Sequence, residues 1–115
     1  MRLYLPFLLV AIVLASVGCG GNPEVTLKQL AESQQDYDGQ GVLTRGIVRH
    51  ERDPDGSNYF VLADPHGMLV GLDPAQKALP FEGRLVHVTG VFQVKPGFGR
   101  IIHITSISLV IGNQN

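Results

Sequence analysis

The sequence has only one cysteine and no surplus of basic residues among its 115 positions. Nine Lys and Arg stand against ten Asp and Glu, so the net charge of −1 argues against an electrostatic grip on phosphate backbones. The length suffices for one domain. Fourteen glycines and seven prolines imply many turns, and they favour short strands over long helices.

Recognisable catalytic motifs are also missing. The sequence contains no Gly-x-Ser-x-Gly elbow, and no Ser, His and acidic residue stand in a familiar nucleophile–base pattern. The Gly97-Phe98-Gly99 segment is too short for a phosphate loop and does not open a helix. We therefore expect a protein that is not an enzyme and needs no cofactor.

Four histidines are candidates for metal binding: His50, His66, His87 and His103. A hairpin turn centred near Gly97 would place His87 opposite a residue near Ile107. His87 and His103 would then be too far apart to share a zinc ion, so we expect no metal site. A histidine-dependent metal or haem carrier using either residue stays as an alternative.

Residues 53–58 carry acidic oxygens but lack the distal glutamate of an EF-hand calcium loop, and we interpret them as a turn.

The N-terminal residues form a long apolar run. Arg2 supplies a positive start, residues 3–14 are mostly apolar, and small residues follow. The run is shorter than the roughly 20 apolar residues of a membrane span. Residues 1–18 are therefore predicted to be an export signal peptide, with an uncleaved N-terminal anchor as the alternative.

Ser16-Val17-Gly18-Cys19 resembles the lipobox of bacterial lipoproteins, although that family usually has Leu where Ser16 stands. The resemblance implies cleavage before Cys19 and attachment of lipid, with acyl chains such as palmitate, to its thiol. Residues 19–25 would be the lipidated cysteine and a tether, whose five residues before Val25 reach at most roughly 18 Å. Gly20 stands where the family's inner-membrane retention signal has Asp. A bacterium with two membranes would thus place the protein on the periplasmic side of its outer membrane.

Beyond the tether, the pattern predicts one short helix and five strands. Thr26 and Gln29 have the spacing of a capping box, so we expect a helix over residues 27–34 that plugs one end of the fold. Residues 73–80 have room for at most two helical turns, with Pro74 as the first helical residue. Residues 112–115 are polar and are predicted to be a flexible tail. Alternation and turn residues divide the rest into strands over 42–49, 59–63, 68–72, 85–94 and 100–109.

The strand alternation predicts a barrel. Val48, Leu62 and Val88 are expected to point into the core. Gly46 in mid-strand suits a strand that bends sharply or approaches another backbone. A long bent first strand, a hairpin, a helical connection and a second hairpin are the components of an OB-fold. An SH3-like five-stranded barrel is the competing fold.

The short Leu-rich helix, Tyr37-Asp38-Gly39, the strand with Gly46 at its centre, and residues 59–64 and 83–90 resemble the small bacterial OB-fold proteins of the tRNA-anticodon-binding-like group. Exported members of that group are often lipoproteins. The resemblance implies an all-β, five-stranded OB-fold barrel with one short helix over residues 26–111. It supports a fold rather than a chemistry.

OB-folds generally bind ligands on the outer face of strands two and three, between the loop after strand one and the loop joining strands four and five. An aromatic ring beside guanidinium groups on that surface can stack on a base or hold an anionic or extended ligand. The simpler interpretation is that Phe98 covers the barrel mouth and that the arginines are solvated. The candidate ligand-binding residues are Arg49, Arg52, Tyr59, Val61, Lys95, Phe98 and Arg100.

We therefore expect an exported protein, anchored to a bacterial membrane through Cys19, whose OB domain binds a protein, a glycan or a small anion. Binding of single-stranded nucleic acid is the alternative that the fold suggests. Without Arg2 and the rest of the leader, eight basic residues face ten acidic ones, and this balance of −2 weighs against nucleic acid.

Overall fold

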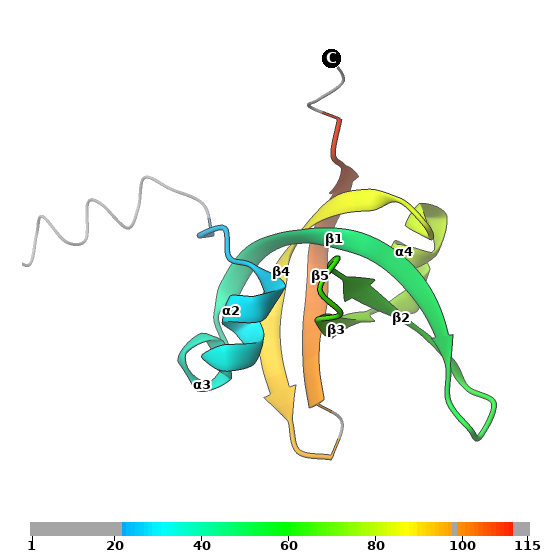
Figure 1. Ribbon diagram of the computed structural model, residues 1–115, viewed down its shortest axis with the longest axis horizontal. Coiled ribbons are helices and arrows are strands. Elements are labelled where there is room, and N and C mark those ends of the chain that lie inside the picture. Colours follow the sequence, from blue (N-terminus) through cyan, green and yellow to red (C-terminus); the bar gives the residue numbers. More distant parts are fainter. Residues whose placement is uncertain (1–21, 98, 112–115) are drawn as a thin grey trace, which may run out of the picture.

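The computed structural model describes residues 22–97 and 99–111 (Figure 1). Five strands form a closed barrel in the order β1-β2-β3-β5-β4, and short helices lie at its margins. All five predicted strands are present, with shifted ends. The strands are β1 (Gly41–Arg52), β2 (Asn58–Ala63), β3 (Leu69–Asp73), β4 (Leu85–Lys95) and β5 (Gly99–Leu109).

The barrel closes through a parallel pair, in which Gly71–Asp73 of β3 face Ile101–His103 of β5. The other neighbouring strands are antiparallel. β1 pairs with β4 through its first half and with β2 through its second half, so it curves around the barrel (Figure 1). This five-stranded order is that of the OB-fold, as predicted, and not that of the SH3-like alternative.

Side chains of alternating residues fill the barrel. Val48, Leu62 and Val88 are fully buried, which confirms the predicted inward face. Gly46 lies at the bend of β1, where an added Cβ would stand 2.7 Å from the carbonyl oxygen of Ala63. The glycine is needed there because another backbone passes so closely.

The helix expected over residues 27–34 is two helices, α2 (Leu27–Glu32) and α3 (Gln34–Tyr37). Ser33 separates them because its φ of −122° and ψ of 39° are not helical. The capping box is confirmed: the backbone N–H of Gln29 donates to Thr26 Oγ1 at 3.0 Å, and the N–H of Thr26 donates to Gln29 Oε1 at 2.8 Å. Leu27 and Leu30 are buried, so α2 extends the core as expected.

Between β3 and β4 the chain forms α4 (Ala75–Ala78) and the 3₁₀ helix η2 (Leu79–Phe81). Pro74 is the N-cap and not the first helical residue, because its ψ of 154° is extended. The prediction for Pro74 was therefore wrong by one position. Within the described residues no helix is long and apolar enough to cross a membrane.

A bulge shifts the register of the β4–β5 hairpin. The register centred on Gly97 holds from Lys95 opposite Gly99 to Gly90 opposite Ile104. Thr89 then faces Ser106, so Thr105 is an extra residue in β5. His87 consequently lies opposite Ser108, which is next to Ile107, and not opposite His103, as expected.

The N-terminal segment is attached to the barrel. The backbone N–H of Leu43 donates to the carbonyl oxygen of Pro23 at 3.0 Å, and the N–H of Val25 donates to the carbonyl oxygen of Leu43 at 2.8 Å. Val25 is also buried in the core. Residues 22–25, which the sequence assigns to a tether, are thus docked on β1. Cys19, the predicted leader and the predicted tail lie outside the described residues.

Candidate functional site

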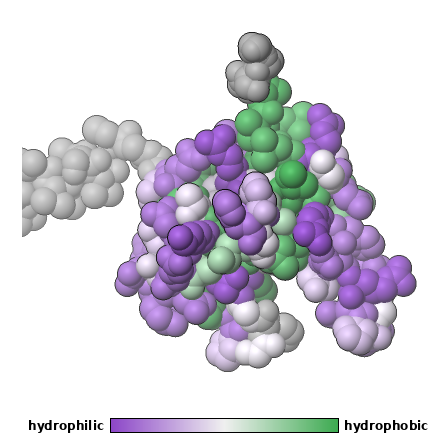
Figure 2. Space-filling model, viewed as in Figure 1, coloured by the Kyte–Doolittle hydropathy of each residue, from purple (hydrophilic) through white to green (hydrophobic). Residues whose placement is uncertain are grey.

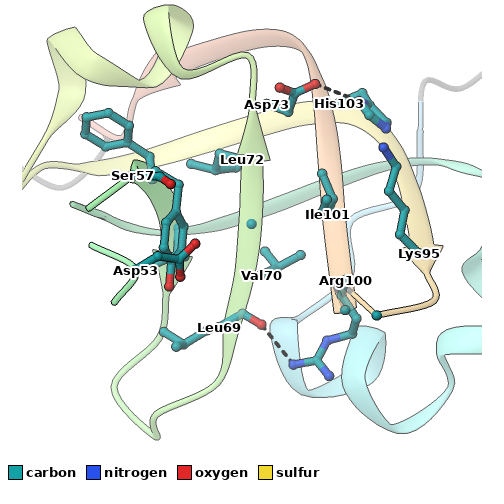
Figure 3. Close-up of a pocket in the computed structure, with 16 residues that line it drawn as sticks. Asp53, Ser57, Leu69, Val70, Leu72, Asp73, Lys95, Arg100, Ile101 and His103 are labelled. Atoms are coloured by element: carbon teal, nitrogen blue, oxygen red, sulfur yellow. Dashed lines mark hydrogen bonds and ion pairs between the residues drawn. The ribbon is translucent and has the colours of Figure 1, made fainter. Parts of the chain in front are cut away.

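A groove of about 760 Å³ lies on the outer face of β2, β3 and β5 (Figure 3). The β1–β2 loop (residues 53–57) contributes to one side, and the start of the β4–β5 turn contributes to the other. This is the face on which the sequence places the candidate site.

The floor of the groove follows one register row across three strands. Val61 of β2 pairs with Gly71 of β3, and Gly71 pairs with Ile101 of β5. All three lie on the outward side of their strands. Gly71 has no side chain to fill the row, and an added Cβ would stand 3.3 Å from the carbonyl oxygen of Arg100. The floor of the groove is therefore apolar.

The walls of the groove carry opposite charges. Asp53 and Ser57 stand on the side of the β1–β2 loop, whereas Lys95 and Arg100 stand on the opposite side (Figure 3). Asp73 also lines the groove. With His103 counted as neutral, the lining has two acidic side chains, Asp53 and Asp73, and two basic ones, Lys95 and Arg100. Its formal net charge is therefore zero.

The acidic wall is part of an ordered turn. The hydroxyl of Ser57 donates to Asp55 Oδ1 at 2.6 Å, and the backbone N–H of Ser57 donates to the same oxygen at 2.9 Å. These hydrogen bonds lower the pKa of Asp55 from its ordinary value of 3.8, and the bond from the Ser57 hydroxyl has the largest effect. The turn interpretation is therefore confirmed for residues 53–57, whereas Asn58 already belongs to β2.

Arg100 is held in place at the basic wall. Its Nη2 donates to the carbonyl oxygen of Leu69 at 2.9 Å, which joins the beginnings of β3 and β5. Its Nε is buried and has no hydrogen-bond partner within the described part of the chain. The Arg100 guanidinium thus uses one of its nitrogens in a hydrogen bond to the barrel backbone, and the side chain also lines the groove.

His103 connects three strands at the same site. Its Nδ1 lies 3.1 Å from Asp73 Oδ2 on β3, and its Nε2 lies 2.7 Å from Gln93 Oε1 on β4. If both ring nitrogens donate, the imidazole is protonated. If the imidazole is neutral, Nδ1 donates to Asp73 and Nε2 accepts from the NH₂ group of Gln93, whose side-chain amide is then flipped. Within residues 22–97 and 99–111, no group of three or more His, Cys, Asp or Glu side chains could hold a metal ion.

The groove brings together four of the seven candidate residues: Tyr59, Val61, Lys95 and Arg100. Arg49 and Arg52 are not among its lining residues. Arg49 Nη2 instead lies 3.0 Å from Glu51 Oε2 on the same strand. Phe98 lies outside the described residues.

Several residues that line the groove were not predicted from the sequence, including Asp53, Ser57, Asp73, Ile101 and His103. Outward alternation along the third and fifth strands would have found the last three. Asp53 and Ser57 were interpreted only as turn formers. Their position beside the groove follows from the length of β1, which extends to Arg52.

No protein-family model and no curated protein matches this sequence. A similar solved structure is the second OB-fold domain of replication protein A from Methanococcus maripaludis. The similarity has a TM-score of 0.38 and 12% sequence identity, and it covers 69% of this chain and 90% of that domain. The assignment of the OB-fold rests on the strand order and pairing of this chain.

Proposed function

We propose that this protein is a lipid-anchored envelope protein whose OB domain binds an extended, electrically neutral or zwitterionic segment of a protein or glycan and catalyses nothing. The groove supports this proposal, since its apolar floor runs between walls of opposite charge. The lipobox-like Ser16-Val17-Gly18-Cys19 supports the anchor.

The charge balance of the groove favours such a ligand over a polyanion. Asp53 and Asp73 would each repel a phosphodiester chain, and Lys95 and Arg100 only offset them. A dipolar chain could instead face the carboxylates with donors and the cations with acceptors. Val61 and Ile101 would contact its apolar parts.

Binding of single-stranded nucleic acid is the second candidate. Tyr59 is 39% exposed in the groove, and a tyrosine ring near cationic side chains can stack on a base. Such binding would weaken steeply as salt rises, because counterions are released from the phosphates.

An NMR titration of the full-length protein in detergent micelles tests the groove. The probes are chitohexaose, a decapeptide of mixed Ser, Lys and Glu, and oligothymidylate, each at low and at high salt. We expect one of the first two probes to shift the amides of Val61 and Gly71, and Tyr59→Ala to weaken that binding about tenfold. Arg52→Ala is the matched control outside the groove. Salt-sensitive binding of oligothymidylate alone would favour the second candidate.

Metabolic labelling with radioactive palmitate tests the anchor. The wild-type protein should carry the label in the membrane fraction, and Cys19→Ala should not. Equal labelling of both proteins would contradict attachment at this cysteine.

A further inference from the structure

An apolar patch lies on the outer surface of the barrel, away from the core. Ile47 of β1 and Leu85 of β4 are register partners, and each is 43% exposed. Ile111, just beyond β5, is 69% exposed, and the neighbouring Val110 N–H donates to the carbonyl oxygen of Leu85 at 3.0 Å. Figure 2 shows apolar surface running from the end of β5 toward the middle of β1. We call Ile47, Leu85 and Ile111 the apolar patch.

The patch breaks the outward pattern of β1. Arg45 and Arg49 flank Ile47 on the same side of the strand, and both are exposed. Single exposed apolar side chains are common on soluble proteins. Adjacent ones that form a continuous surface instead mark a contact with a partner or a membrane.

The start of the described chain places the anchor near this patch. The side chain of Asn22 packs against Gly41, where an added Cβ would stand 2.7 Å from Asn22 Oδ1. Three peptide steps separate Asn22 from Cys19, and they span at most roughly 11 Å. Gly41, beside which Asn22 lies, precedes Ile47 by six residues, or roughly 20 Å of strand. A lipid on Cys19 would therefore hold this side of the barrel close to a bilayer.

We propose that the apolar patch rests on the lipid surface in which the acyl chains of Cys19 are embedded. This proposal depends on the proposed lipid anchor. The bilayer is the favoured occupant because the short anchor brings it within reach, whereas residues 112–115 are polar and suit an apolar surface poorly. The β4–β5 hairpin leads from Leu85 at the patch to Lys95 at the groove over roughly 30 Å of strand. Ile47 and Leu85 of the patch are therefore separated along the sheet from Lys95 of the groove.

Single-tryptophan variants test this orientation, because the sequence has no tryptophan of its own. Ile47→Trp places the probe in the patch, and Tyr59→Trp places it in the groove at similar exposure, 39%. The full lipidated proteins are reconstituted into phosphatidylethanolamine–phosphatidylglycerol vesicles with brominated acyl chains. We expect quenching and a blue shift for Ile47→Trp, with intensity reduced about twofold, and little change for Tyr59→Trp. Leu85→Trp serves as a second patch probe if Ile47→Trp fails to fold.

Palmitate labelling of the same preparations separates the two proposals. Labelled protein with no quenching at the patch, or with equal quenching at Tyr59→Trp, overturns the orientation and leaves the anchor standing. Chemical cross-linking of two copies through the patch in vesicles also overturns it, because a second copy then covers the surface. Unlabelled wild-type protein overturns both the anchor and the orientation.

Discussion

Among single residues, Gly90 has the least space for a side chain. It lies beside the bulge of the β4–β5 hairpin. A Cβ added there would overlap the carbonyl oxygen of His103, which belongs to rigid backbone. We predict that Gly90→Ala lowers the free energy of unfolding by about 3 kcal/mol. Gly71→Ala, whose Cβ would stand 3.3 Å from the carbonyl oxygen of Arg100, should cost about 1 kcal/mol. Urea denaturation measures both, and equal losses would contradict the packing argument.

Asp55 gives the β1–β2 loop a dependence on pH. Because hydrogen bonds from Ser57 lower the pKa of the folded carboxyl, its stabilising effect is present above the ordinary value of 3.8. That effect is lost as pH falls through the lowered folded pKa. We predict that the amide signal of Ser57 moves with a midpoint below 3.8 in an NMR titration. Asp55→Ala should abolish this movement, and a midpoint at or above the ordinary value would refute the prediction.

At the scale of single elements, α2 depends on its cap and its contacts. Six residues are too few for a stable helix in water, so the Thr26–Gln29 capping box and the burial of Leu27 and Leu30 must hold it. We predict that Thr26→Ala lowers the free energy of unfolding by about 1 kcal/mol in thermal or urea denaturation. Ser33→Ala is the control, because Ser33 makes no side-chain capping bond, and it should have a smaller effect.

Most of the secondary structure could be predicted because alternation and turn residues are local signals. The alternation that includes Val48, Leu62 and Val88 predicts the core face, and all three side chains are fully buried. The bulge at Thr89 and Gly90 could not be predicted in this way, since it depends on how two strands fit together. The break at Ser33 was equally invisible, because serine is compatible with both helix and cap.

The candidate site was predictable in part for the same reason. Tyr59 and Val61 follow from the outward face of one strand. Asp73 and His103 are 30 residues apart, and only the parallel β3–β5 pair brings them within hydrogen-bonding distance. Arg49 and Arg52 were placed at the site by sequence position alone, and they are outside the groove because no residue of β1 lines it.

At the scale of the whole molecule, the strand pairs that close the barrel differ in length. β3 and β5 share three residue pairs, whereas β1 and β4 share seven and β4 and β5 share ten. We predict that native-state hydrogen exchange at Gly71 and Ile101 is faster than at Thr44 and Val88, because the shorter seam opens at a lower free energy. Uniform protection across these amides would show that the barrel opens only as one unit.

The docked N-terminal segment has a consequence for solubility. Pro23 and Val25 occupy the backbone N–H and C=O groups of Leu43 that point away from β4. Without residues 22–25, this rim of the sheet would offer unpaired main-chain groups to another chain. Residues 22–25 therefore guard the barrel against edge-to-edge aggregation.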